Sequence, residues 1–193
     1  NSVGAHWLES HLFNTAEKKL ENPQVLMVTS LKVFKGIEKY IQLSKLNPHI
    51  RFAIALNCET SEFLDFESEY KSSNFIPYHR PSTLKQLYAS SMCILNLSDQ
   101  ELCVETFGLT LVEGMCYGCV PIGPLVGGPS EIINNDIGLK VNPNDLDVLS
   151  YFIQKLTDNP LLFEGYYDRC LIESKKYMFD NYRSKFCKCI GVI

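Results

Sequence analysis

The segment from Gln24 to Asn47, QVLMVTSLKVFKGIEKYIQLSKLN, contains the pattern that decides the fold of this chain. Its first part, Gln24–Thr29, is a short apolar run without alternation of polar and apolar residues, which is typical of a strand buried on both faces. After Gly36, apolar residues recur at positions 37, 40, 41, 43 and 46. This spacing predicts an amphipathic helix over Ile37–Asn47. The segment is therefore expected to form a strand and a helix that packs on it.

The same strand–helix unit recurs along the chain. Short apolar runs predict further strands at Phe52–Leu56, Asn74–Tyr78, Cys93–Leu97, Val120–Gly123 and Leu139–Val141. Helical patterns follow them at Glu62–Lys71, Pro81–Ser90, Gly108–Tyr117, Pro129–Asn134, Leu146–Thr157 and 161–178. Pro81 and Pro129 suit a first helical turn, and Asp145 suits an N-cap position. The alternation predicts an α/β fold: a doubly wound, Rossmann-like parallel sheet of about six strands with helices on both faces.

The composition is that of a globular protein and excludes several other classes. The 193 residues are 46% hydrophobic and 21% charged, which argues against disorder, collagen and coiled coil. The formal net charge is −4, so nucleic acid is not an expected partner. No apolar run approaches the roughly 20 residues that span a bilayer, and the start of the chain lacks the basic and apolar regions of a signal peptide.

The regular pattern begins at Gln24 and sets the expected domain limits. Residues 1–22 are expected to be a linker or arm from an amino-terminal domain that this chain does not include. Residues 23–178 are expected to form the Rossmann-like domain, and residues 179–193 a tail. Because the chain starts with Asn1 rather than Met, we expect an excised piece of a longer protein.

Eight cysteines raise the question of a disulfide framework. Such frameworks belong mainly to short secreted chains that cannot build a sufficient core. Most cysteines here lie in apolar runs such as MCILNL and MCYGCVPI, where a free cysteine acts as a small apolar side chain. The C-x-x-C of Cys116 and Cys119 has no second pair, so zinc and redox chemistry are disfavoured. A reducing, cytoplasmic location is expected.

Open parallel sheets bind ligands beyond the carboxyl ends of their strands, so the loops that follow the strands are the candidate site. These loops contain no G-x-G-x-x-G and no G-x-x-x-x-G-K-[ST], which disfavours a nicotinamide dehydrogenase and a P-loop NTPase. The G-x-S-x-G elbow of α/β-hydrolases does not occur in them either.

The most informative stretch, at 105–118, reads ETFGLTLVEGMCYG. Gly108 opens the predicted helix, so the amides of Phe107, Gly108 and Leu109 are expected to be available to an anion such as phosphate. Glu105 and Glu113 flank this position, which suits a nucleotide-sugar with hydroxyl groups on both sides of its phosphates. The alternative is a helix-terminal role for Glu105 and a solvated position for Glu113.

Lys35 belongs to the same candidate site. It precedes Gly36, after the first strand, and is therefore expected at the same edge of the sheet. A lysine there can act as a point charge on phosphate, although an ordinary surface lysine is the alternative.

The order of these motifs resembles the carboxyl-terminal, donor-binding half of a retaining GT-B glycosyltransferase of the glycogen-synthase-like family four. The resemblance covers about residues 24–157 and is carried by VLMVTSLKVFKG, LKQLYASSMCILNLS, ETFGLTLVEGMCYGCVPIG, VGGPSEII and GLKVNPND. It implies one half of a GT-B fold and transfer of a hexose from a nucleoside-diphosphate sugar with retention of configuration. It also implies synthesis of a polysaccharide or glycoconjugate, with no metal and no other cofactor.

The resemblance implies roles for individual residues. Lys35 would hold the donor diphosphate and Glu105 would contact the transferred sugar, so these two are the expected catalytic residues. Glu113 would bind the ribose hydroxyls, and the segment 76–78 would face the nucleobase. The expected substrate-binding residues are Ser30, Lys32, Ile76, Pro77, Tyr78, Thr106, Phe107, Gly108, Leu109 and Glu113.

The sequence also departs from the family pattern. Ser30 stands where the family usually has an arginine, so Lys32 is expected to supply the charge, or else the diphosphate binds more weakly or differently. Pro77 stands where glycine is common. The acceptor sugar, lipid or protein would be bound mainly by the amino-terminal domain, which would also make any peripheral membrane contact. This chain alone is therefore expected to be inactive.

Weaker motifs have structural explanations. Asp145-Leu146-Asp147 spells D-x-D, but helix capping explains it. The four histidines lack the spacing of a zinc site, although His79 beside Arg80 follows the third strand and a ligand role stays open.

Two other functions remain as alternatives. One is a sugar-nucleotide epimerase of GT-B shape. The other is a non-catalytic Rossmann-like domain for nucleotide binding or assembly, which Ser30 favours and which Glu105 and Glu113 disfavour.

Overall fold

The computed structural model describes residues 15–178, which form a six-stranded parallel sheet in the order β3-β2-β1-β4-β5-β6. Every neighbouring pair of strands in it is parallel. The strands are β1 (Gln24–Ser30), β2 (Arg51–Asn57), β3 (Phe75–His79), β4 (Cys93–Leu95), β5 (Val120–Gly123) and β6 (Leu139–Lys140). The predicted fold class and all six predicted strands are confirmed, although β4 and β6 are shorter than expected.

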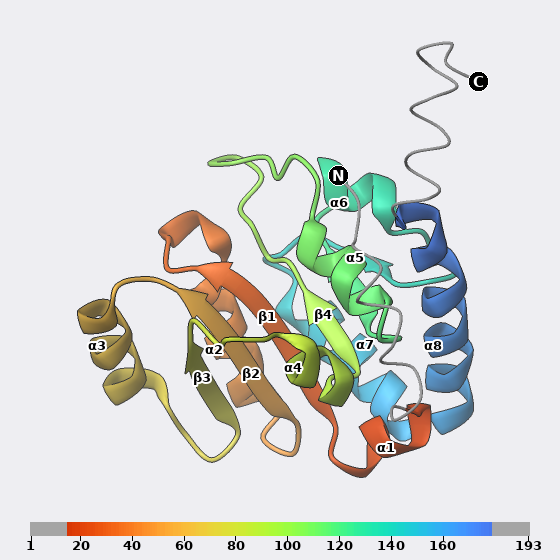
Figure 1. Ribbon diagram of the computed structural model, residues 1–193, viewed down its shortest axis with the longest axis horizontal. Helices are drawn as coiled ribbons and strands as arrows, with labels where there is room; N and C mark the ends of the chain where they lie inside the picture. Colours follow the sequence, from red (N-terminus) through yellow and green to blue (C-terminus); the bar gives the residue numbers. More distant parts are fainter. Residues whose placement is uncertain (1–14, 179–193) are drawn as a thin grey trace.

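Helices cover both faces of the sheet (Figure 1). Along β1, Val25 and Met27 face one core and Leu26 faces the other, so both faces of the strand are buried. The first core packs against α2 (Ile37–Leu46), α3 (Thr60–Tyr70), α7 (Leu146–Asp158) and α8 (Pro160–Ser174). The second packs against α4 (Lys85–Ser90), α5 (Leu109–Met115) and α6 (Gly128–Ile132). Two-sided burial is the physical reason why the strands lack alternation.

Some helix boundaries differ from the sequence-based prediction. Helix α4 begins at Lys85, so the prediction of Pro81 in a first helical turn is wrong. Pro129 does lie in the first turn of α6. Asp145 occupies the N-cap position of α7, but its side chain makes no capping hydrogen bond. In the chain from 15 to 178, no helix is long and apolar enough to cross a membrane.

A short helix precedes the first strand in a region where the sequence shows no clean period. Helix α1 (Ala16–Glu21) contacts α8 and α4 at the lower right of Figure 1. Lys19 is only 1% exposed, and its Nζ donates hydrogen bonds to the carbonyl oxygens of Tyr88, at 2.8 Å, and Ser91. Because the buried position of this helix is occupied by a lysine, the sequence shows no apolar face from which the helix could be predicted.

Loss of the Lys19 ammonium group is expected to destabilise the domain. Lys19→Met leaves two buried carbonyl groups without this donor, so the free energy of unfolding in urea should fall by about 1–3 kcal/mol. Lys18→Met, an exposed neighbour, is the matched control and should change it by less than about 0.5 kcal/mol. Equal stability of the two variants would contradict the anchoring role of Lys19.

The same substitution is expected to change the pH dependence of stability. Burial lowers the pKa of Lys19 from its ordinary value of 10.5, so the unfolded chain holds this proton to higher pH than the folded protein does. The free energy of unfolding should therefore rise as the pH approaches 10.5, and Lys19→Met should remove that component of the rise.

Candidate active site

The central strands β1 and β4 are neighbours, although two strands and their helices separate them in the chain. Strand order reverses between them, and such a point leaves a crevice at the carboxyl edge of the sheet. A cavity of about 230 Å³ lies there. It is lined by Met27, Val28, Thr29, Ser30, Lys35, Leu95, Asn96, Ser98, Glu105, Gly108, Leu109 and Thr110.

An ion pair between Lys35 and Glu105 lies on the wall of this cavity. The Nζ of Lys35 is 2.8 Å from Oε2 of Glu105, and the two side chains are 22% and 23% exposed. Lys35 ends the short 3-10 helix η2 (Val33–Lys35), and Gly36 then turns the chain into α2. The two expected catalytic residues therefore meet, although they are 70 positions apart in the chain.

Residues at the start of α5 line the same cavity. Gly108 is the N-cap residue, with a φ of 90° that favours glycine, and its carbonyl oxygen accepts from the amide of Leu111 at 3.0 Å. The amides of Leu109 and Thr110 precede the first hydrogen bond of the helix, and both residues line the cavity. Amides in this position can bind an anion beside Lys35.

The loop that carries Glu105 is held by the start of α6. The amide of Gly128 donates to the carbonyl oxygen of Glu105 at 2.8 Å. A Cβ atom on Gly128 would lie 2.5 Å from the Phe107 nitrogen and 2.5 Å from the Thr106 oxygen. Only a glycine lets the two backbones approach this closely, so Gly128 positions the Glu105 carboxylate. The site predicted from the sequence does not include Gly128. Its position in the V-G-G-P motif was the signal that could have identified it.

A second cavity, of about 430 Å³, adjoins the first. Both are lined by Val28, Thr29, Ser30 and Thr110. The second extends over the ends of β2 and β3 and is further lined by Ala55, Leu56, Asn57, Arg80, Pro81 and Leu84. We call the two cavities together the groove.

Glu113 does not line either cavity of the groove. Its Oε2 accepts a hydrogen bond from the hydroxyl of Tyr88 at 2.8 Å. Burial raises the pKa of Glu113, and the hydrogen bond from Tyr88 lowers it by a smaller amount. Thr110, one helical turn before Glu113, lines the groove instead. The two glutamates of the motif are therefore not equivalent, since only Glu105 borders the cavity.

Several other expected binding residues do not line the groove. Ile76, Pro77 and Tyr78 are paired with β2 inside the sheet, because β3 continues to His79. Lys32 lines a different cavity, beside α2 and α3. Thr106 is exposed. Phe107 packs edge-on against Tyr177, with ring centroids 6.2 Å apart.

The weaker motifs have structural partners in this fold. Nε2 of His79 lies 3.0 Å from the carbonyl oxygen of Cys58, and its ring stacks on Phe63. The thiols of Cys116 and Cys119 are buried and donate hydrogen bonds to main-chain carbonyl oxygens. Across residues 15–178, no group of three or more histidine, cysteine or acidic side chains could hold a metal ion.

The sequence pattern described as "Glycosyl transferases group 1" matches residues 10–176. This chain belongs to that family. Glycogen synthase from Aquifex aeolicus is 33% identical over 119 residues, which are 60% of this chain and 25% of that protein. The chain therefore spans about a quarter of the length of this relative.

Solved structures of glycosyltransferases share the fold. Sucrose-phosphate synthase from Thermosynechococcus elongatus matches with a TM-score of 0.78 and 17% identity, over 100% of this chain and 52% of that one. HepE from Anabaena, solved in complex with UDP-glucose, matches with a TM-score of 0.73 and 15% identity, over 90% of this chain and 50% of that one. The GT-B-type, Rossmann-like architecture of this glycosyltransferase domain is thereby shown.

The approach of α6 to the Glu105 loop can be tested with glycine variants. Gly128→Ala should lower the free energy of unfolding by about 1–3 kcal/mol, because the new methyl group must displace the backbone of Thr106 and Phe107. Gly165→Ala is the matched control, since its Cβ would meet only the flexible end of Arg169 at 3.2 Å. Within α8 it should stabilise the domain by up to about 1 kcal/mol. Similar changes in the free energy of unfolding for Gly128→Ala and Gly165→Ala, measured in urea, would contradict the close approach of α6 to the Glu105 loop.

The pH dependence of stability should report the half-buried carboxyl group of Glu113. Because burial raises its pKa, its contribution to stability is fully present below the ordinary value of 4.5 and is lost as the pH rises through the folded-state pKa. Glu113→Gln should therefore stabilise the domain by about 1 kcal/mol at pH 7 and have less effect near pH 4. Tyr88→Phe, which removes the donor, should destabilise it by about 1–3 kcal/mol at pH 7. Urea unfolding at both pH values measures these differences.

Proposed function

We propose that this domain binds the donor of a retaining hexosyltransferase, a nucleoside-diphosphate sugar. The observation that carries the proposal is the Lys35–Glu105 ion pair on the wall of a cavity that the amides of Leu109 and Thr110 also border. A cation and main-chain amides suit a phosphate group, and a carboxylate suits sugar hydroxyl groups. The groove thus offers both kinds of contact within a few residues.

In the proposed reaction, this domain acts by positioning and by charge stabilisation. Lys35 holds the diphosphate and stabilises the negative charge that develops on the departing nucleoside diphosphate. Phosphate competes with Glu105 for the lysine, which releases the carboxylate toward the sugar. Gly108, whose positive φ favours glycine, turns the chain into α5 so that the amides of Leu109 and Thr110 border the ligand. In this mechanism Lys35 and the amides, rather than a metal, balance the phosphate charge.

The similarity to HepE, which was solved with UDP-glucose, supports a nucleotide-sugar as donor. The chain spans about half of that structure and of sucrose-phosphate synthase. We therefore propose that a further domain binds the acceptor sugar, lipid or protein, and that this chain by itself does not turn over substrate.

A cytoplasmic location completes the proposal. Within residues 15–178, Cys58, Cys93, Cys116, Cys119 and Cys170 are buried and all cysteines are unpaired. Free thiols that pack as small apolar groups are typical of a reducing compartment.

Nucleotide binding tests the proposed function directly. Titration calorimetry of the 193-residue chain with UDP, GDP and ADP should show binding of at least one of them. Lys35→Gln should weaken that binding by about tenfold or more, because it removes the charged donor to the diphosphate. Lys45→Gln, at the far end of α2, is the matched control and should leave the affinity unchanged. No binding of any nucleotide by the wild-type chain would contradict the proposed function.

A further inference from the structure

We propose that Arg80 is a second phosphate-binding cation of this groove and that it exchanges Glu59 for the donor when the nucleotide binds. This inference rests on the proposed function. It assigns to Arg80 the charge that sequence reasoning sought in Lys32, a residue that lies beside another cavity.

The charge balance of the groove requires a further cation. Of the described residues that line it, only Lys35 and Arg80 are positively charged, and Glu105 is the one carboxylate. Lys35 is already neutralised by Glu105 at 2.8 Å. A nucleoside diphosphate carries more negative charge than one lysine can balance, so a second cation within reach of the phosphates would strengthen binding.

The sheet places Arg80 at the groove. Its amide donates to the carbonyl oxygen of Leu56 at 3.0 Å, which holds it at the carboxyl end of β2. In the register of β1 and β2, Ser30 pairs with Asn57. Ser30 lines both cavities, and Asn57 and Arg80 line the second. Ser30, Asn57 and Arg80 thus follow one another across the edge of the sheet, from the cavity that contains Lys35 into the second cavity.

The backbone of Arg80 supports a functional role. With a φ of 35°, it is the one residue other than glycine that has a positive φ in the chain from 15 to 178. A side chain in this region of φ is strained, so the surrounding structure must hold it there. The neighbouring His79 ring lies 3.0 Å from the Cys58 carbonyl oxygen and stacks on Phe63.

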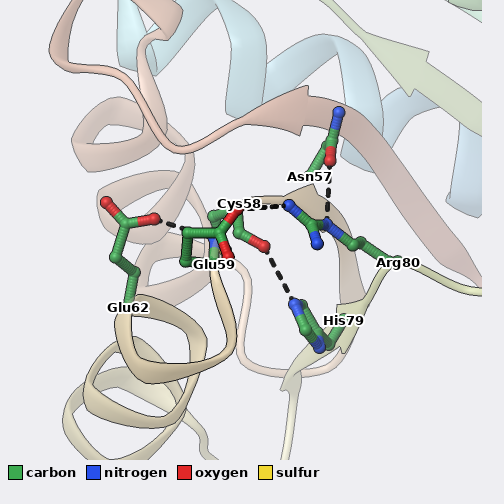
Figure 2. A network of polar contacts seen from close by, with 6 residues as sticks. All are labelled: Asn57, Cys58, Glu59, Glu62, His79 and Arg80. Atoms are coloured by element: carbon green, nitrogen blue, oxygen red, sulfur yellow. Dashed lines mark hydrogen bonds and ion pairs between the residues drawn. The ribbon is translucent and has the colours of Figure 1, made fainter.

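The present partners of Arg80 leave it free to exchange. Figure 2 shows its side chain reaching Asn57 and Glu59, where Nε donates to Oδ1 of Asn57 at 3.0 Å and Nη2 to Oε1 of Glu59 at 2.9 Å. The ion pair with Glu59 is exposed, with side chains 48% and 75% accessible, and such surface pairs contribute little to stability. A phosphate accepts two parallel hydrogen bonds from a guanidinium group and is the stronger partner.

Glu59 has a second role that keeps it in place during the exchange. Its carboxylate caps α3 by accepting from the amide of Glu62, and the Glu62 carboxylate accepts from the amide of Glu59 at 2.8 Å. Glu59 is therefore retained by the helix when Arg80 leaves. Asn57 can still hold Nε of Arg80 and orient the guanidinium group toward the phosphate.

Calorimetry with the nucleoside diphosphate that the wild-type chain prefers tests the proposal. Arg80→Gln should weaken binding by about tenfold or more, whereas Arg80→Lys should lose less affinity, because it keeps the charge and loses only the two parallel hydrogen bonds. Arg51→Gln removes an exposed guanidinium group from the opposite end of β2 and is the matched control, with unchanged affinity. Unchanged affinity in Arg80→Gln would overturn the proposal. A loss of affinity in Arg80→Lys as large as that in Arg80→Gln would also overturn it, since the positive charge would then contribute nothing to binding.

Two further variants test the role of Arg80 in other ways. Glu59→Gln keeps an oxygen to cap α3 but removes the competing charge, so it should tighten nucleotide binding several-fold, and unchanged affinity would refute the exchange. Adding Ser30→Arg to Arg80→Gln restores a cation where the two cavities join and should recover much of the lost affinity. Failure of this rescue, with normal thermal unfolding of the variant, would count against a charge role for Arg80.

The results also separate this inference from the proposed function. If the wild-type chain binds a nucleoside diphosphate and Lys35→Gln loses it while Arg80→Gln does not, the donor site stands and the role of Arg80 is refuted. If the wild-type chain binds none of the three nucleotides, both fail together.

Discussion

The reversal of strand order between β1 and β4 is the constraint on which the rest of this structure depends. The chain leaves β1 toward α2 and leaves β4 toward α5, and these helices cover opposite faces of the sheet. The loops above the two central strands therefore diverge and leave a cavity between them. Lys35 from one loop and Glu105 from the other meet on its wall. No other position in this sheet order brings two such loops together.

The site is built from backbone contacts as much as from side chains. Gly108 turns the chain into α5, and Gly128 lets α6 pack directly on the backbone beside Glu105. These close approaches fix where the carboxylate lies before any ligand arrives. The charged groups are then neutralised within the free protein, Lys35 by Glu105 and Arg80 by Glu59. In the binding mode that we propose, a phosphate ligand replaces these carboxylates.

Much of the fold was predictable because the central strands β1, β2, β4 and β5 are buried on both faces and amphipathic helices follow several strands. The helix of residues 16–21 escaped prediction because its buried residue is Lys19, a charged side chain that reads as surface. Pro81 misled the prediction of α4 because the bend at Arg80 delays the helix to Lys85. Local sequence patterns predict the burial of apolar residues well. They do not show which distant groups bind a lysine or an arginine and so make it part of the structure.

The sequence by itself determined the parallel α/β architecture, the family resemblance and the meeting of the loops that carry Lys35 and Glu105. These follow from short-range periodicity and from the edge at which parallel strands end. Only the tertiary structure decided that Glu113 turns to Tyr88, that Lys32 lies beside another cavity and that Arg80 borders the groove. The physical reason is that the rotation of a helix and the course of a loop are set by packing against elements distant in the chain, which no local pattern specifies.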